Sequence, residues 1–255
     1  MKHILIAAKS EFLILKRYPL NLFYTIIATL FFLLPLFYIT KTYNVEQQQY
    51  LWMLSGGVFW MYISQALWVI GLSLRKEQEI GTLEQIFLSP TNLIFIMIGK
   101  SLITLGINSL TLSIGVLLIK YIFNCHINFL IIFIIPIISI PAIFGFAYII
   151  SGMVIKFKEI FAFLQVLVGL LFIFSGISQP IKFLPYKLGG ISKFIVFEKM
   201  IYIFRQAIID SPTFSEISND LIYIGVYGLI LNIIAIFIFY YFRKRVLKNG
   251  DGLYV

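Results

Sequence analysis

The sequence predicts an all-α integral membrane protein with six transmembrane helices. Of the 255 residues, 60% are hydrophobic and only 12% are charged, whereas an average soluble domain is about 45–50% apolar and about 25% charged. Six runs of the chain also reach the roughly 20 apolar residues that a helix needs to cross a bilayer. These runs are residues 20–39, 51–74, 93–119, 127–155, 161–179 and 221–242. We therefore expect residues 1–255 to form a single transmembrane domain.

Residues 1–19 precede the first span and are predicted to form an amphipathic helix. Lys2, Lys9 and Lys16 recur every seven residues, so they share one face of a helix, while apolar side chains occupy the other. Pro19 then ends the segment. A basic amphipathic helix of this kind lies in the membrane interface; the alternative is a simple extension of the first span. That span is too long to be the hydrophobic region of a cleaved signal peptide, so we expect it to be retained.

A short helix is predicted between spans two and three, within residues 79–90. Gly81 ends a charged run, and Thr82 followed three residues later by Gln85 is typical of a capping box at a helix start. Pro90 cannot continue a helix because it lacks a backbone donor. The helix would thus have a defined beginning and end, and would lie outside the bilayer.

The fourth span contains Pro136 and Pro141. Proline removes a backbone donor and clashes with the preceding turn of a helix, so we expect this span to be kinked or broken. The freed carbonyl groups then need partners on neighbouring helices.

The connection from 180 to 220 is predicted to form short helices on the outer side of the membrane. Residues that break helices or favour turns end span five: Ser175, Gly176, Gln179, Pro180 and Pro185. Residues 191–209 have an amphipathic pattern and are expected to lie on or partly in the outer leaflet. A seventh span is not expected there, because Glu198, Lys199 and Arg205 would be costly at the middle of a membrane.

The Lys and Arg residues are divided unevenly between the two sides. With the N-terminus inside, 13 of the 20 fall on the cytoplasmic side, and five of the other seven lie in the single long loop after span five. Short loops carry most of the orientation signal. This distribution predicts that both termini, the segment 75–90 and the basic tail 243–255 face the cytoplasm, in the plasma membrane of a prokaryotic cell.

The residues that enzymes use are scarce. The two histidines, His3 and His126, lie on opposite sides of the membrane in this topology, and Cys125 is the single cysteine. Neither an H-x-x-x-H pair nor a G-x-S-x-G turn occurs. We therefore predict no catalytic residue and no metal site. The polar residues within the spans are expected to form hydrogen bonds between helices; they are Gln65, Asn108, Gln165 and Asn232.

The sequence also disfavours two further functions, nucleotide binding through a phosphate-binding loop and ion-coupled transport. Gly99, Lys100 and Ser101 resemble the end of a phosphate-binding loop, but Ile94 occupies the position where that loop needs a glycine. Lys100 is instead expected to anchor one end of span three. An ion-coupled transporter normally has an ionisable residue within its spans, and none of the six runs has one near its centre.

The segment RKEQEIGTLEQIFLSPTNLIFIMIGK, residues 75–100, resembles the signature of ABC-2 type transporter permeases. The matching residues are Glu79, Gly81, Thr82, Leu83, Glu84, Gln85, Pro90, Gly99 and Lys100. A second segment, SGISQPIKFLP at 175–185, is similar to the Ser-Gly and two-proline segment that ends span five in that family. Arg205 stands where an arginine is common in the outer loop, and the basic tail is also similar.

The resemblance implies a six-span permease subunit that pairs with a second permease copy, identical or different, and with a separate ATPase subunit. No cofactor is then bound by this chain, since ATP and Mg²⁺ belong to the ATPase. The short helix after span two would be the coupling helix that docks in the ATPase. The outer helices after span five would be re-entrant, with Ser175, Gly176, Pro180, Pro185 and Arg205 in an outer loop or gate.

The predicted docking helix has one apolar stripe, formed by Leu83, Ile86 and Phe87 at helical spacing. We hypothesise that this stripe fills an apolar groove of the ATPase, with Glu84 and Gln85 making polar contacts. The alternative is a capped helix that lies on the membrane-facing surface of its own chain.

The substrate is less well defined by the sequence. Trp60, Trp68 and Asn108 are candidates for lining a pathway, although ordinary helix packing is the alternative for the tryptophans. The N-terminus lacks the arginine-tyrosine and Leu-Gly pattern of polysaccharide exporters, which favours efflux of an amphiphilic, drug-like, lipid or peptide substrate. The remaining alternatives are an ion-coupled transporter or a membrane scaffold without an ATPase partner.

Overall fold

The computed structural model describes residues 2–20, 47–88, 93–125, 127–156, 160–177 and 195–249, with single residues or pairs between 23 and 38 and Ser192. All the regular secondary structure in these residues is helical, which confirms the predicted all-α class. The helices are α1 (Lys2–Arg17), α3 (Gln47–Gly71), α4 (Ser73–Ile80), α5 (Leu83–Leu88), α6 (Leu93–Phe123), α7 (Phe129–Lys156), α8 (Ile160–Phe174), α10 (Val196–Ile209) and α11 (Phe214–Asn249).

Four helical segments of the described residues are long and apolar enough to cross a membrane. They are Leu51–Ile80, Ile94–Phe123, Phe129–Met153 and Phe214–Tyr241, and they match the second, third, fourth and sixth predicted spans. The predicted first span, 20–39, lies largely outside the described residues. The predicted fifth span corresponds to α8, whose 15 residues reach only about 22 Å, short of the roughly 30 Å hydrocarbon core. The six-span layout therefore remains a prediction.

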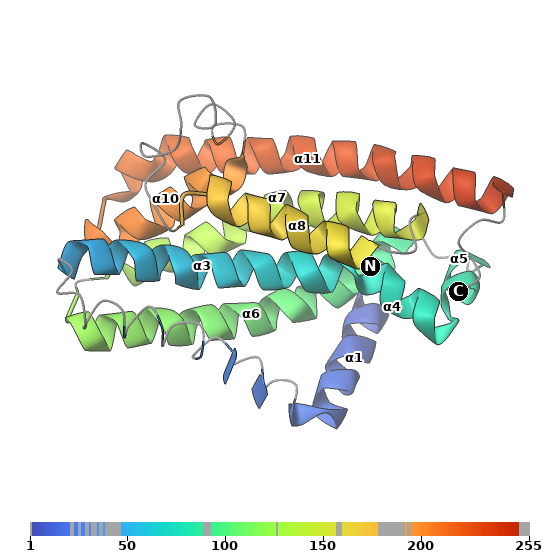
Figure 1. The fold of residues 1–255 in the computed structure, drawn as a ribbon, viewed down its shortest axis with the longest axis horizontal. Coiled ribbons are helices and arrows are strands. Elements are labelled where there is room, and N and C mark those ends of the chain that lie inside the picture. The colour runs from blue at the N-terminus through green and yellow to red at the C-terminus, as the bar shows by residue number, and fades with distance from the viewer. Residues whose placement is uncertain are drawn as a thin grey trace.

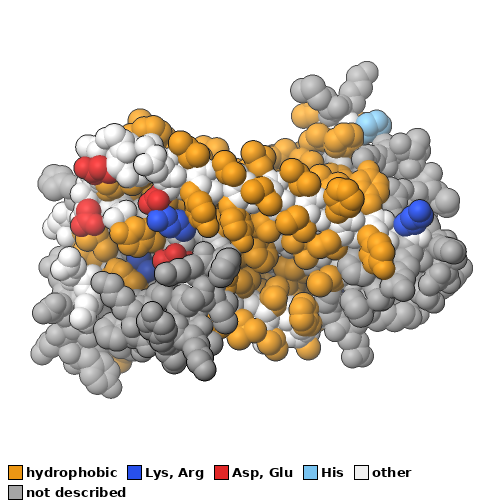
Figure 2. Space-filling view, turned by 90° about the horizontal axis from the view of Figure 1, so that it is seen from above, with side chains coloured by type: hydrophobic (Ala, Val, Ile, Leu, Met, Phe, Trp, Pro, Cys, Tyr) orange, Lys and Arg blue, Asp and Glu red, His pale blue; other side chains and the backbone are white. Residues whose placement is uncertain are grey.

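The long helices α3, α6, α7, α8 and α11 run along the long axis of the molecule (Figure 1). Helices α4 and α5 lie at one end, here called the α5 end, and α10 lies at the other, called the α10 end. In Figure 2, hydrophobic side chains form a continuous band across the middle of the visible face, while the described charged side chains lie toward its two ends. This distribution is that of a multi-pass membrane protein.

Helices α7 and α11 pack with little space between their backbones. A Cβ atom built on Gly145 would lie 2.6 Å from the Cβ of Leu231, and one on Gly228 would lie 2.7 Å from the backbone nitrogen of Ala142. Small residues allow this close approach in membrane bundles. The side-chain amide of Asn232 donates to the carbonyl of Pro141 across the same interface, which confirms the predicted interhelical role of Asn232.

Helix α7 is continuous from Phe129 to Lys156 with Pro136 and Pro141 inside it, so the span is not broken, and the alternative of a kink stays a prediction. In a packed membrane bundle, neighbouring helices can satisfy the backbone groups that proline disturbs. Asn232 donates to the carbonyl of Pro141, whereas the carbonyls that lose their helical donor to the two prolines are those four residues earlier, of Ile132 and Ile137. The two prolines are thus tolerated within α7, next to its close contact with α11.

Helix α1 crosses α6 at a steep angle (Figure 1). A Cβ atom on Gly99 would lie 2.4 Å from the carbonyl oxygen of Ile4 and 2.7 Å from the Cβ of Ala7, so the two helices touch through their backbones. Ala7 is buried there, while Leu5 and Phe12 are exposed. The amphipathic segment is therefore docked on the bundle through one face.

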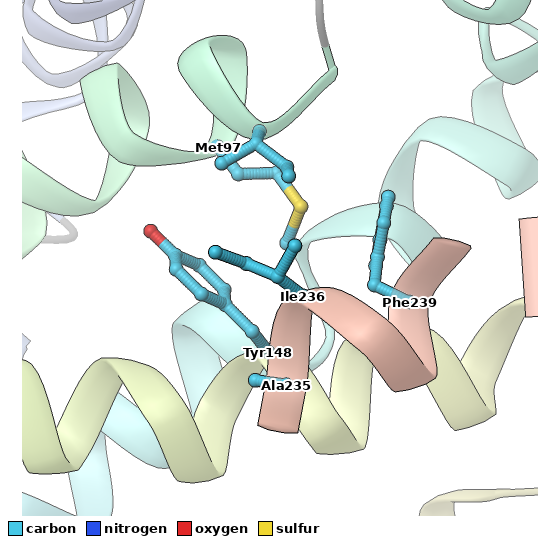
Figure 3. Close-up of a pocket in the computed structure, with 6 residues that line it drawn as sticks. Met97, Tyr148, Ala235, Ile236 and Phe239 are labelled. Carbon is cyan, nitrogen blue, oxygen red and sulfur yellow. The ribbon is translucent and has the colours of Figure 1, made fainter. Parts of the chain in front are cut away.

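At the α5 end, α6, α7 and α11 meet around a cavity of only about 10 Å³ lined by Met97, Tyr148, Ala235, Ile236 and Phe239 together with Ile94. Figure 3 shows the side chains converging from the three helices, with the Tyr148 hydroxyl directed away from Phe239. A space of this size holds at most a single water molecule. These three helices are thus closely packed near α5.

Helix α10 is more deeply enclosed than its amphipathic pattern predicts. Phe197, Met200, Ile201 and Phe204 are all fully buried. Phe204 stacks on Phe59 of α3 with ring centroids 4.4 Å apart. The segment predicted to lie on or partly in the outer leaflet is therefore packed among the long helices, against α3, α7 and α11.

Candidate functional site

The first candidate site is the corner where α4 ends and α5 begins. Gly81 has φ of 79°, a left-handed conformation that favours glycine. Its N–H donates to the carbonyl of Gln78 at 3.1 Å, and the N–H of Thr82 donates to the carbonyl of Glu77 at 3.0 Å. This pair of bonds is the Schellman motif that ends a helix. The predicted end of the charged run at Gly81 is therefore a true helix end.

The corner is tied to α6 by the carboxylate of Glu77. The Thr82 hydroxyl donates to this carboxylate, and the ammonium group of Lys100 on α6 also donates to it. We call these three residues the Glu77 junction. Thr82 directly precedes α5, as predicted, but the contact that the structure gives its hydroxyl is with Glu77 and not with Gln85.

The sequence analysis did not identify Glu77. It is one of several charges in the run from 75 to 79, and its partner Lys100 lies 23 residues further along the chain. Only the prediction of Lys100 as an anchor of span three pointed toward this contact. The structure shows that α4, through Glu77, is the element to which Lys100 is anchored.

Two of the three residues in the predicted apolar stripe of α5 turn inward. Leu83 is only 2% exposed and belongs to the core of the chain, and Ile86 packs against that core. The hypothesis that Leu83 enters a groove of a partner is therefore wrong, because helical periodicity does not distinguish a partner's groove from the chain's own core. The side chains of Glu84 and Phe87, and all of Pro90, lie outside the described part of the structure.

The outward surface of the corner is formed by other residues. Ile80 is 63% exposed, and Gly81 and Gln85 are also exposed. Glu79 accepts a hydrogen bond from Arg75 at 3.0 Å and remains largely exposed. We call Glu79, Ile80, Gly81 and Gln85 the corner rim. Ile80 is its apolar member, and the sequence analysis did not single it out.

A cavity of about 110 Å³ lies behind this corner, with a lining of mixed character. Its charged and hydroxyl-bearing residues include Glu11 of α1, Lys76 and Glu77 of α4, and Lys100 and Ser101 of α6. Apolar side chains complete the lining: Ile14, Val69, Ile70, Ile80 and Met97.

The second candidate site surrounds Arg205 at the α10 end. The Arg205 side chain is almost fully buried and donates to three backbone carbonyls: Trp52 at 2.9 Å, Gly176 at 3.1 Å and Ile177 at 3.2 Å. Its guanidinium also lies 3.5 Å from the ring centroid of Trp52. Burial lowers the pKa of Arg205 to about 9, so the side chain stays charged at neutral pH.

The residues around Arg205 come from three separate parts of the chain. The structure brings together Arg205, Gly176 and the buried Ser175, as the outer-loop prediction grouped them; Pro180 and Pro185 lie outside the described residues. Gly56 of α3 was not predicted. A Cβ atom there would lie 2.2 Å from Nη2 of Arg205, so the guanidinium occupies the space of a missing side chain.

The three candidate pathway residues lie on two helices, Trp60 and Trp68 on α3 and Asn108 on α6. Trp60 and Trp68 face α8, where their rings lie 5.8 Å from Phe172 and 5.2 Å from Phe161 between centroids, contacts that match the packing alternative. Asn108 is 3% exposed on α6, and its amide nitrogen has no hydrogen-bond partner among the described residues.

Comparison with known proteins adds one finding. A family model described as ABC-2 type transporter matches residues 2–209. The matched part runs from α1 through α10, so it includes the corner, the Glu77 junction and the surroundings of Arg205. No curated protein matches the chain.

Proposed function

Since the chain belongs to the ABC-2 type transporter family and is a membrane permease of that type, we propose that it exports an amphiphile, powered by a separate ATPase subunit. The one segment that resembles a phosphate-binding loop, at Gly99 to Ser101, has Ile94 where that motif needs a glycine. ATP and Mg²⁺ would therefore be bound by the ATPase, and this chain would receive the energy through contact alone.

The corner between α4 and α5 is the observation that carries this proposal. It presents an exposed rim, Glu79 to Gly81 at the end of α4 with Gln85 of α5, and on its inner side Leu83 is buried in the core of the chain. The Glu77 junction ties the same corner to α6. A docking element that transmits movement of the ATPase to the transmembrane helices needs both features, an outward contact surface and a stiff connection to the spans.

The proposed assembly contains two permease copies and two ATPase subunits. The excess of Lys and Arg near the α5 end supports placing both termini and the corner in the cytoplasm. Arg205 and the residues whose carbonyls it binds, Trp52, Gly176 and Ile177, are here called the Arg205 cluster. This cluster would then lie at the outer side, where it holds α10 against α3 and the end of α8. A largely apolar bundle supports an amphiphilic substrate, whether drug-like, lipid or peptide.

Replacing Ile80 with glutamate tests the docking role of the rim. We expect the ATPase that co-purifies with the chain to fall by at least about tenfold, because an unpaired carboxylate buried in an interface costs more than the roughly 1.4 kcal/mol that a tenfold change represents. The measurement is the ATPase-to-permease ratio after purification from membranes. Lys9→Gln, an exposed change on α1, is the control and should leave the ratio unchanged.

The same membrane preparations distinguish an ATP-driven permease from an ion-coupled transporter. Glu84→Lys and Phe87→Ala on α5 should reduce ATP-dependent transport while the permease still inserts. Transport in vesicles driven by an ion gradient without ATP would support an ion-coupled transporter instead. Full transport by Ile80→Glu with the normal amount of ATPase would rule out the rim as the docking surface.

A further inference from the structure

An apolar trough runs between α6 and α7 toward the α10 end. Its volume is about 290 Å³, and Tyr62 of α3 lies at its floor. Its walls include Leu117, Phe133 and Ile137, which are 54%, 53% and 64% exposed. The trough is therefore open to the outside of the bundle at the level of the membrane, and lipid is the solvent that reaches it there.

The trough covers most of the depth of one leaflet. Its wall on α6 extends from Ser109 to Leu117, a distance of about 12 Å along a helix, compared with about 15 Å for half of a bilayer core. Ser109 lies near the middle of the span Ile94–Phe123, and Leu117 lies toward its end. The trough thus extends from near the membrane centre to near one interface.

The walls of the trough suit a hydrocarbon chain better than a polar ligand. Ser109 and Ser113 are the hydroxyl-bearing residues of the α6 wall, and each donates to its own helix, Ser109 to the carbonyl of Leu105 at 2.8 Å and Ser113 to the carbonyl of Ser109 at 2.7 Å. The volume is at the lower limit of pockets that enclose drug-sized ligands. A single acyl chain, which is narrow and apolar, suits such a trough.

A positive charge stands at the interfacial end. Lys120 is exposed, and its ammonium nitrogen lies 4.5 Å from the ring centroid of Phe129, a residue that lines the trough. The neighbouring Tyr121 is 85% exposed, as aromatic residues at a membrane interface often are. A cation directly above an apolar trough matches a lipid with an anionic headgroup.

We propose that the trough between α6 and α7 binds one acyl chain of a resident anionic phospholipid, with the headgroup phosphate close to Lys120. The lipid would belong to the leaflet at the α10 end. Because this site is made by α3, α6 and α7 of one chain, it needs neither the ATPase nor a direction of transport. It is thus independent of the proposed export function.

Native mass spectrometry of the purified full-length chain tests this site. After delipidation, dioleoyl phosphatidylglycerol or dioleoyl phosphatidylcholine is added back, and we expect one retained lipid per chain with a preference for phosphatidylglycerol. Ser113→Trp should fill the trough and abolish retention of both lipids. Lys120→Gln should keep a lipid but reduce the preference for phosphatidylglycerol about fivefold, the loss expected for one lysine near anionic lipid.

Two further variants make the outcome decisive. Phe237→Trp, at a 76% exposed position of α11, is the control and should retain lipid as the unmodified chain does. Ile140→Trp fills the same trough from α7, in case Ser113→Trp fails to fold. Unchanged retention in the folded trough-filling variant would refute the site, and an unchanged preference in Lys120→Gln would refute the headgroup position. Release of the lipid on addition of ATP and the ATPase would show a transported molecule and overturn the resident lipid.

Discussion

At the scale of single residues, Arg205 and Glu77 show two ways to hold a charged group, Arg205 almost fully buried and Glu77 partly exposed. Arg205 is bound by three backbone carbonyls and one aromatic ring. Glu77 is bound by two side chains, those of Thr82 and Lys100. A buried charge is tolerated when it is hydrogen-bonded in this way. Because both hydrogen-bond partners of the Glu77 carboxylate are side chains, whereas those of Arg205 are backbone carbonyls, the charges at the Glu77 junction can be exchanged by substitution.

Reversing one charge of the Glu77–Lys100 pair should therefore be harmful, and reversing both should restore the pair. Glu77→Lys places two ammonium groups together, and Lys100→Glu places two carboxylates together, so each single variant should lower the unfolding temperature of the purified permease and its ATP-dependent transport. The double variant restores opposite charges, and Thr82 can still accept a hydrogen bond from the new lysine. We expect a coupling energy of about 1 kcal/mol for this partly exposed pair.

A double-mutant cycle based on thermal unfolding in detergent measures this coupling, and transport assays show whether function returns with stability. Arg75→Glu, which affects only the exposed pair with Glu79, is a control that should change stability little. A double variant no better than the sum of its two single variants would show that Glu77 and Lys100 do not act as a pair.

At the scale of helices, the contact between α7 and α11 depends on small residues facing each other. The same helix, α11, offers two glycines three residues apart with different surroundings. At Gly228 a Cβ atom would lie 2.7 Å from the backbone of α7, whereas at Gly225 the nearest atom is 4.0 Å away. The backbone cannot move aside locally as a flexible side chain can, so the two positions should respond differently to the same change.

Gly228→Ala should destabilise the permease, and Gly225→Ala should not. The clash at Gly228 should cost about 1–3 kcal/mol, as other overpacking does, while alanine at Gly225 gains up to about 1 kcal/mol of helix propensity. The measurement is the apparent unfolding temperature of each variant in the same detergent. Equal unfolding temperatures for the two variants would mean that α7 and α11 do not approach as closely as described.

The helices and their limits were largely predictable, but the surfaces they present to one another were not. Length and apolar composition were enough for the four long spans, since a bilayer imposes both. The side toward which Leu83 and Ile86 of α5 point could not be predicted. Their spacing is the same whether the stripe contacts a partner or the core of its own chain. The close approach of α1 at Gly99 also needs three-dimensional information, as a glycine in a helix gives no sign of what crosses it.

At the scale of the whole molecule, the span Leu51–Ile80 connects the two candidate sites. It begins beside Arg205, which bonds to the carbonyl of Trp52 and fills the space at Gly56, and it ends in α4 with Glu77. A displacement of the corner can therefore reach the Arg205 cluster through two consecutive helices, α4 and α3, joined at Leu72. This arrangement has a function only if the two ends face opposite sides of the membrane.

Cysteine labelling in intact cells tests that orientation. In a Cys125→Ser background, Ser215→Cys at the α10 end should react with a membrane-impermeant thiol reagent added outside, because the excess of Lys and Arg predicts that the α5 end is cytoplasmic. Gln85→Cys, also exposed, should react only after the cells are permeabilised. The background without either cysteine controls for other reactive groups. Labelling of Gln85→Cys and protection of Ser215→Cys in intact cells would invert the topology, and the corner could then not meet a cytoplasmic ATPase.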